Sequence, residues 1–107
     1  MNFNVGFEEH GIDLRHHFSG GVYAKETHIP KGKKLLQHKH PFDHMSILAS
    51  GEVLVRADGW VEKMKGPAVI DMKAGVEHEV ESLTDAVWFC VHRSVETDPG
   101  KIDHILT

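Results

Sequence analysis

The chain has 107 residues, which is enough for one compact domain with a single core, and its 40% hydrophobic and 26% charged residues are ordinary for a globular protein. A formal net charge of −4 argues against a phosphate-binding surface, so we expect no nucleic-acid partner. No apolar run reaches the roughly 18 residues that a membrane span needs, and the N-terminal residues lack the pattern of a signal peptide. We therefore expect no membrane association and a cytoplasmic location. The single cysteine, Cys90, cannot form a disulfide within the chain.

Short β-branched and aromatic segments alternate with turn signals along most of the chain. Asp58-Gly59 is the strongest hairpin signal, and Pro30 to Lys33, Ser50 to Glu52, Gly66-Pro67 and Leu83 to Asp85 also read as turns or breaks. No segment keeps a helical period over three turns, and residues 1–20 are poorly patterned apart from one short segment. We predict strands near residues 12–18, 22–29, 35–40, 45–49, 53–57, 60–64, 68–71, 76–82 and 86–92. This spacing predicts one antiparallel all-β domain, either a sandwich or a barrel.

Three of the ten histidines fall within seven residues, at His38, His40 and His44. On a strand, side chains two residues apart share a face, so His38 and His40 can both point inward. His44 is an even step further, and His78 would come from a distant strand. Four neutral imidazoles suit a divalent Mn, Fe, Ni, Cu or Zn ion. The alternative is that these are surface histidines that form H-x-H by chance.

The remaining candidates have simpler interpretations. We expect His28 to be only a weak candidate for the interior, and no role can be assigned to His92. Gln37 is expected to be exposed, and Ser82 could support a ligand. On the strand near 86–92, either the face of Cys90 or the face of Phe89 could point inward. We expect surface positions for His10, His16, His17 and His104, and core positions for Phe42, Met45, Ile47 and Trp60.

From Gly32 to Ser82 the chain resembles the cupin superfamily. Its first motif is a glycine, five residues, H-x-H, three or four residues, a glutamate, six residues and a glycine, and Gly32, His38, His40, His44 and Gly51 keep every spacing. Its second motif, P-x-G followed by two residues and a histidine, corresponds to Lys73-Ala74-Gly75 and His78. Lys73 replaces the turn proline, and His44 replaces the glutamate. Small bacterial cupins with an all-histidine manganese site are similar in this respect, and they also carry a cysteine at the position of Cys90.

The resemblance implies a double-stranded β-helix, the jelly-roll cupin barrel, with residues 1–107 as a single cupin domain whose two motifs lie in a barrel of about residues 22–92. It implies that His38, His40, His44 and His78 bind one divalent metal, with Mn(II) or Fe(II) preferred and Ni, Zn or Cu possible. Two neighbouring metal positions would remain for water, dioxygen or substrate. Cys90 would lie near the metal, although for a catalytic role we favour the simpler interpretation that it is a buried small hydrophobe.

The expected function is a Mn- or Fe-dependent oxygenase, a dioxygenase-type enzyme acting on a small organic substrate. Because histidine replaces the usual carboxylate, the metal charge is not compensated by its ligands, which favours an anionic or oxygen-chelating substrate. The alternatives are a non-catalytic metal-dependent binding or sensing module, an oxygen-independent isomerase or lyase, and a purely structural zinc site. The resemblance also implies a homodimer, for which the apolar strand from Ala86 to Val91 is the candidate contact.

Overall fold

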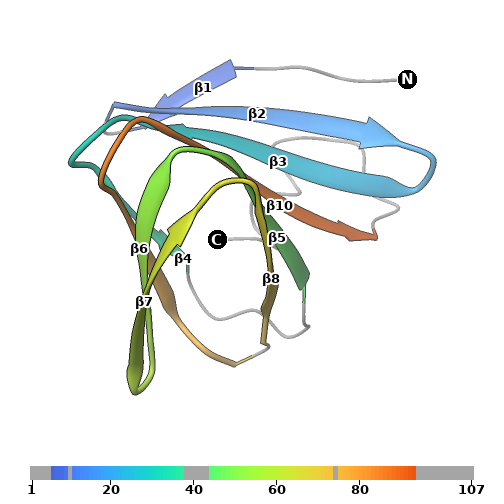
Figure 1. Ribbon diagram of the computed structural model, residues 1–107. Helices are drawn as coiled ribbons and strands as arrows, with labels where there is room; N and C mark the ends of the chain where they lie inside the picture. Colours follow the sequence, from blue (N-terminus) through green and yellow to red (C-terminus); the bar gives the residue numbers. More distant parts are fainter. Residues whose placement is uncertain (1–5, 10, 38–43, 74, 94–107) are drawn as a thin grey trace.

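The computed structural model describes residues 6–9, 11–37, 44–73 and 75–93, and these form ten strands without a helix (Figure 1). In this part of the chain, no helix has the length and apolarity of a membrane span. The strands are β1 (Gly6–Glu9), β2 (Ile12–Ser19), β3 (Val22–Ile29), β4 (Lys34–Gln37), β5 (His44–Ser50), β6 (Glu52–Ala57), β7 (Trp60–Lys65), β8 (Ala68–Met72), β9 (His78–Ser82) and β10 (Ala86–Arg93).

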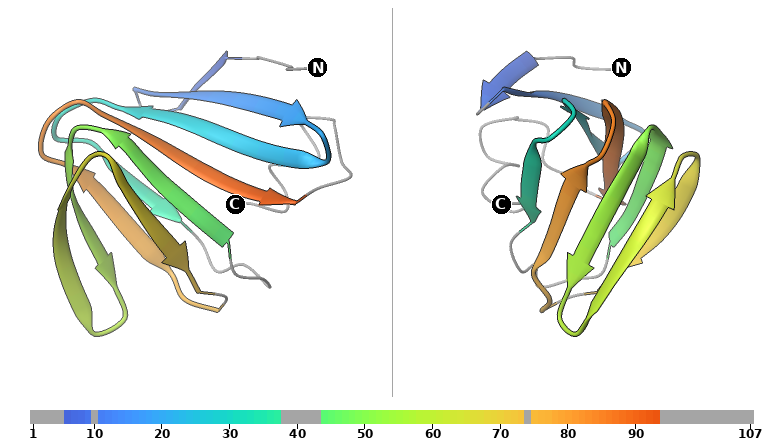
Figure 2. Two further views of the ribbon diagram at one scale, coloured as in Figure 1. Left: turned by 45° about the vertical axis from the view of Figure 1, so that its right-hand side comes forward. Right: turned by 60° about the vertical axis from the view of Figure 1, so that its left-hand side comes forward.

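The strands form two antiparallel sheets. The larger sheet has the order β1-β2-β3-β10-β5-β8, and the smaller has the order β4-β9-β6-β7. Figure 2 shows the sheets facing each other, with the chain crossing between them at the β3–β4, β4–β5, β5–β6, β7–β8, β8–β9 and β9–β10 connections. One cluster of buried apolar residues from both sheets, including Ile29, Leu48, Val55, Val80 and Trp88, fills the space between them. The antiparallel all-β prediction is confirmed.

The predicted strands agree with the observed ones to within one or two residues, because turn residues mark nearly every boundary; the exception is the end of the strand predicted at 35–40, which lies outside the described residues. The hairpin at Asp58-Gly59 joins β6 to β7 as predicted. Two predictions need correction. The strand expected from Val76 begins only at His78, and β1 was not predicted at all. β1 pairs with only one neighbour, β2, and its four residues, Gly-Phe-Glu-Glu, carry little β propensity.

Three turns meet at one end of the barrel, which we call the turn end. The Gly32 N–H donates to the Ser82 carbonyl, and the Leu83 N–H donates to the Glu52 carbonyl. The Lys31 N–H donates to the Asp85 carboxylate at 2.8 Å. These bonds tie the turns at residues 30–33, 50–52 and 83–85 together, so positions along each strand can be counted from this end.

The barrel interior changes from apolar to polar with distance from the turn end. The first two inward positions of the strands carry mainly Ile29, Ala86, Trp88, Leu48 and Val80, all buried. The next inward positions are polar. The described buried residues there are Lys25 and His16 on β3 and β2, Cys90 on β10, Ser46 on β5 and His78 on β9. Polar side chains that are buried at one level of a barrel indicate a site rather than a core.

Four burial predictions made from sequence are wrong, and the prediction for Phe42 lies outside the described residues. Met45 and Trp60, expected in the core, are among the exposed large hydrophobic residues, and Ile47 lies partly buried on the outer face of β5. Met45 alternates with the inward residue Ser46 on β5, and Trp60 starts the edge strand β7. His16, expected at the surface, is fully buried because it alternates with Leu14 and Phe18 on the inward face of β2.

On the outer face of the larger sheet, Glu26 lies between two histidines. His17 Nε2 is 2.8 Å from one carboxylate oxygen, and His28 Nε2 contacts the other. Burial alone would raise the pKa of Glu26. The hydrogen bonds and charges of His28 and His17 outweigh burial, so the pKa lies below its ordinary value of 4.5. His28 is thus an outer-face residue, half-buried rather than inside the barrel.

Replacing Glu26 with glutamine is expected to destabilise the protein modestly, by less than about 1 kcal/mol, at pH 5.5, and by progressively less as the pH falls through the folded pKa of Glu26. A carboxyl whose folded pKa is depressed stabilises the fold above its unfolded pKa, and this contribution is lost as pH falls through the folded value. Urea unfolding of both proteins at pH 5.5 and at a series of lower pH values measures the difference. A loss of stability that does not change with pH would contradict the ionic origin.

Candidate metal centre

His78 is the predicted ligand whose side chain the structure describes. It is the first residue of β9, faces the barrel interior and is only 6% exposed. Burial lowers the pKa of His78 from its ordinary 6.5, although a hydrogen bond with the backbone of Val76 raises it in part. A histidine that is buried, neutral and held by a backbone carbonyl through one ring nitrogen has its other nitrogen oriented for a metal.

The sheet register brings the other predicted ligands towards the same end of the barrel. Gln37, the last residue of β4, pairs with His78, so the chain enters the segment with His38 and His40 directly beside β9. His44 pairs with Met72, the last residue of β8. Residues 73–77 join β8 to β9, so the strand ends that carry His44 and His78 are separated by one short loop.

His38 and His40 lie outside the described residues, and so does the side chain of His44. The backbone position of His44 alternates with the exposed Met45 and shares its face with the buried Ser46, so it is an inward position of β5. The register gives a different result for β4. Gln37 shares a face with His78, so His38 and His40 can face the interior only if the alternation changes after Gln37. The prediction that Gln37 is exposed likewise lies outside the described side chains.

Within the described residues, no three His, Cys, Asp or Glu side chains converge on a common point. The test of the predicted donor set therefore rests on His78. Its burial, its neutral ring and its backbone hydrogen bond fit an imidazole ligand of a transition metal. The interior near it also fits, because the buried polar residues at its level contain imidazole, hydroxyl and thiol groups.

Solved structures with this arrangement of strands include several cupins. An RmlC-like cupin from Shewanella frigidimarina matches with a TM-score of 0.75 and 18% identity, over 89% of this chain and 87% of its own. The structure of KdgF from Halomonas sp. matches with a TM-score of 0.74 and 14% identity, over 86% and 89%. A predicted oxalate decarboxylase from Thermotoga maritima matches with a TM-score of 0.67 and 19% identity, over 78% and 81%. The chain has the cupin fold.

The two sheets are thus the two halves of the jelly-roll that the sequence motifs predict. In contrast to this structural agreement, neither a protein-family model nor a curated protein matches the sequence. These three structures share 14–19% identity with the chain, which establishes its fold and leaves its chemistry to be argued from its own residues.

Cys90 lies on the inward face of β10. It is buried, with its Sγ 3.8 Å from the Ser46 hydroxyl, and it shares its face with Trp88 and His92. The structure therefore decides the question that the sequence left open about the two faces of β10. The outer residues of the strand, including Phe89, are only partly buried. A role for Cys90 in the chemistry stays a prediction.

The interior contains polar residues that the sequence interpretation did not assign. His16 Nδ1 lies 2.5 Å from the Tyr23 hydroxyl, and their rings stack with centroids 5.7 Å apart. His92 meets Tyr23 edge-on at 5.4 Å. The alternation of Ile12, Leu14, His16 and Phe18 could have placed His16 inside, because an apolar–polar pattern of period two identifies the buried face of a strand.

Nearer the turn end, three polar atoms are buried with no hydrogen-bond partner within the described part of the chain. They are the Trp88 indole Nε1, the Thr27 hydroxyl and the Ser82 hydroxyl. Trp88 and Thr27 are directly paired across β10 and β3. Buried donors of this kind normally bond to a protein group, water or ligand. The part of the barrel interior between His78 and the turn end therefore offers polar contacts as well as apolar walls.

Proposed function

We propose that this cupin binds one divalent transition metal, Mn(II) or Fe(II), through His38, His40, His44 and His78, and uses it for oxygenase-type chemistry on a small organic substrate. The observation that carries the proposal is His78: a buried, neutral, backbone-anchored imidazole at the end of the barrel where the register also brings the His44 position. The spacing of His38, His40 and His44 to Gly32 and Gly51, and of His78 to Gly75, supports the complete donor set.

When bound, such a metal polarises an oxygen donor and binds small oxygen ligands at its open positions. The side chains of the barrel would orient the ligand and exclude water. His78 keeps one ring orientation through the Val76 backbone. The apolar residues between His78 and the turn end, among them Leu48 and Val80, exclude water from one side of the substrate. A donor set without a carboxylate leaves the metal charge uncompensated, so an anionic oxygen donor is the favoured substrate.

Two measurements test this function. Elemental analysis of protein purified without added metal identifies the ion, and an oxygen electrode then measures uptake with candidate diketones, enediols and styrene-like alkenes. We expect about one transition-metal ion per chain and oxygen uptake with one substrate class. Metal without oxygen uptake would instead favour the isomerase, lyase or binding-module alternatives. The absence of any retained metal would overturn the proposal.

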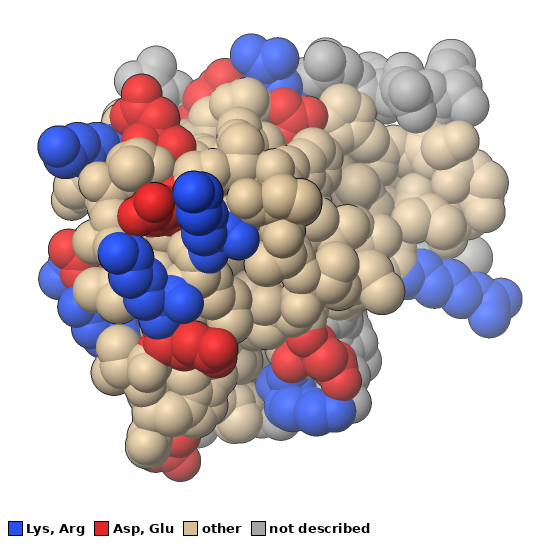
Figure 3. Space-filling model, viewed as in Figure 1, with Lys and Arg blue, Asp and Glu red and all other residues tan. Residues whose placement is uncertain are grey.

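We also propose a homodimer that forms through the outer face of the larger sheet. Phe89, Ile47 and Val69 lie in one row across β10, β5 and β8, and Val91 pairs with Met45 in the next row. We call these five residues the outer patch. Met45 and Val69 are exposed and the other three are partly buried. Figure 3 shows a broad surface with few charges over this sheet, whereas charged side chains gather over the smaller sheet. A contiguous apolar sheet face is typical of a protein interface.

Replacing Val69 with lysine is expected to convert the dimer to a monomer, because burying an unpaired ammonium group in an apolar interface is costly. Val61→Lys is the matched control. Val61 is 62% exposed on β7, close to the 67% of Val69, but it lies on the other sheet. Sedimentation equilibrium measures the mass of each protein. A monomeric wild type, or two variants that dissociate equally, would contradict this interface.

A further inference from the structure

Three side chains of the edge strand β7 lie on the face of the smaller sheet that covers the core: Trp60, Glu62 and Met64. They alternate along the strand, so they share one face. Met64 packs against the core cluster, and Glu62 pairs directly with Val55, a fully buried core residue of β6. Directly paired residues lie on the same face of a sheet. Trp60 is nevertheless 40% exposed and Glu62 is exposed as well, because β7 has no neighbour beyond it in this sheet.

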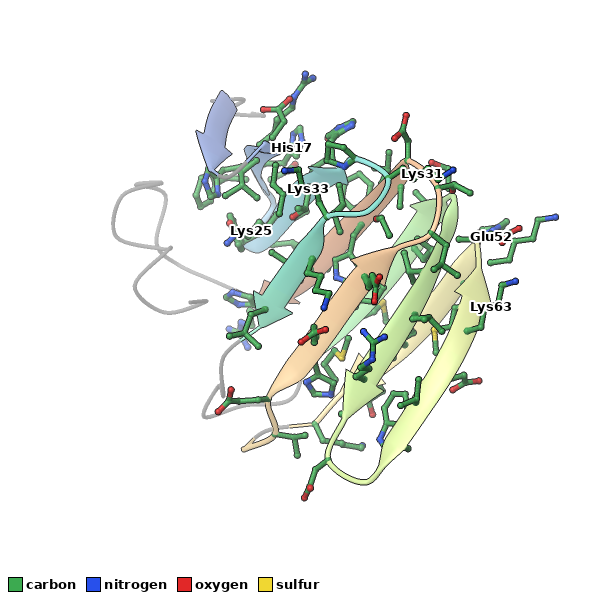
Figure 4. The ribbon with its side chains drawn as sticks, turned by 90° about the vertical axis from the view of Figure 1, so that its left-hand side faces the viewer. His17, Lys25, Lys31, Lys33, Glu52 and Lys63 are labelled. Atoms are coloured by element: carbon green, nitrogen blue, oxygen red, sulfur yellow. The ribbon has the colours of Figure 1, made fainter. Side chains whose placement is uncertain are left out.

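Glu62 differs from the other strand carboxylates whose side chains the structure describes, because it has no ion pair within the described part of the chain. The carboxylates that do contact a basic side chain are Asp13, Glu26, Glu52, Asp71, Glu79 and Glu81. Lys63, the residue after Glu62, points to the opposite face and pairs with Glu52. Figure 4 shows these two side chains side by side at the β7 edge of the smaller sheet. The nearest lysine along the strand therefore does not neutralise Glu62.

Trp60 supplies an aromatic face beside this carboxylate. Residues two apart on a strand are separated by roughly 7 Å, so one small group can contact the indole of Trp60 and the carboxylate of Glu62 together. Among the described residues, neither side chain has a hydrogen-bond or ring partner. A cation is attracted to the negative face of an aromatic ring, and tryptophan gives the strongest contact of this kind. An exposed indole beside an unpaired carboxylate therefore matches the chemistry of an organic cation.

The pair of Trp60 and Glu62 lies towards the end of the barrel opposite the turn end. β6 runs from the turn end to Ala57, which pairs with Trp60 across the hairpin. The last pair between β6 and β9 precedes Ala57 on β6 and follows His78 on β9, so the next position along each strand brings these two residues level. At about 4.8 Å between neighbouring strands, the backbones of Trp60 and His78 are roughly 10 Å apart. A small ligand held at Trp60 can therefore extend along this row towards His78.

We propose that Trp60 and Glu62 bind the ammonium group of a small organic cation, a primary amine or a quaternary ammonium compound. The cation contacts the face of the indole, and the carboxylate neutralises its charge. A neutral ligand such as a sugar would leave the charge of Glu62 unpaired. Both side chains belong to β7, so the site goes beyond the metal-binding proposal and does not require a bound metal.

Calorimetric titration of the full chain tests this site. Choline and ethanolamine are each compared with the neutral alcohol in which carbon replaces the ammonium nitrogen. We expect at least one cation to bind about three- to thirtyfold more tightly than its neutral counterpart. Glu62→Gln should remove most of this preference, because the amide keeps the shape of the carboxylate without its charge. Trp60→Leu should weaken binding of the cation by about two- to fivefold, and Trp60→Phe should restore part of the loss.

Asp58→Asn is the matched control. Asp58 is an exposed carboxylate of the same hairpin, so this change removes the same charge, and asparagine before Gly59 suits the turn. The Asp58→Asn protein should keep the preference for the cation. Melting temperatures equal to that of the wild type confirm that Glu62→Gln and Trp60→Leu remain folded.

Three results would overturn this inference. They are no binding of either cation, equal binding of cation and neutral alcohol by the wild type, and equal losses of preference in Glu62→Gln and Asp58→Asn. The last result would mean that only the net negative charge of the hairpin attracts the cation. The titration measures neither retained metal nor oxygen uptake, so its failure leaves the metal-binding proposal standing, and failure of that proposal leaves this site standing.

Discussion

His78→Ala is expected to lower the affinity for the divalent metal by on the order of a hundredfold or more while the barrel stays folded. Loss of groups that only support a ligand costs about 10- to 100-fold in metal affinity, so loss of a ligand costs at least as much. The remaining three histidines come from one segment of the chain, residues 38–44, and His78 is the predicted ligand that closes the site from the smaller sheet. Without His78, the only predicted ligands of the metal would be those of the 38–44 segment.

The fold should survive this change because His78 lies outside the apolar cluster of the core. Circular dichroism of the metal-free protein tests this directly, and His78→Gln provides a second variant that better fills the space of the ring. His28→Ala is the control: His28 is a half-buried histidine that contacts Glu26 on the outer face. It should bind metal as tightly as the wild type.

Melting curves with and without metal separate the outcomes. A ligand that binds only the folded state raises its stability, so removal of metal from the wild type and from His28→Ala should lower the melting temperature. The His78→Ala protein should melt at nearly the same temperature in both conditions. Metal retained by His78→Ala but lost by His28→Ala would contradict the assignment of the site to the barrel interior.

Much of the fold was predictable from sequence because turn-forming residues mark the boundaries of the strands. Asp58-Gly59, Ser50-Gly51 and the Pro30–Lys33 turn end strands where the structure ends them. The alternation of apolar and polar residues then determines which face of a strand is buried, but only if it is read for every residue. The surface position predicted for His16 is wrong because the prediction considers only its residue type. Its neighbours Leu14 and Phe18 mark its face of β2 as the buried one.

The candidate site was predictable in composition and less so in geometry. The two motif spacings, to Gly32 and Gly51 and to Gly75, select four of ten histidines, and the buried, neutral His78 agrees with that choice. Gln37 rather than His38 shares a face with His78, so period-two alternation along β4 does not by itself predict inward positions for His38 and His40. The burial of Lys25 on β3 could not be assigned from its residue type, because a lysine on a strand is ordinarily an outward residue. Only the register with Cys90 and His16 places it inside.

Gly51→Ala is expected to destabilise the protein by about 2–5 kcal/mol, the largest loss of stability that we predict for a single methyl group. Gly51 has a positive φ of 93°, a conformation that costs other residues about 1–2 kcal/mol. A Cβ at this position would lie 2.4 Å from the Asp85 carbonyl oxygen and 2.8 Å from the Ala86 Cα. Both are backbone atoms of the corner between β9 and β10, so the overlap adds a further cost of about 1–3 kcal/mol or more.

Gly59→Ala separates these two costs. Gly59 also has a positive φ, of 79°, but a Cβ there would meet no atom within 4 Å. It should therefore lose only the conformational part, about 1–2 kcal/mol. At roughly 4–8 °C per kcal/mol for a domain of this size, thermal unfolding should show Gly51→Ala melting at least about 4 °C below Gly59→Ala. Equal losses of stability would mean that the backbone of this corner moves to accommodate the methyl group. A larger loss at Gly51 would instead show that this motif glycine is required because the turn end leaves no space for a side chain. The turn end aligns the strands that carry His44 and His78.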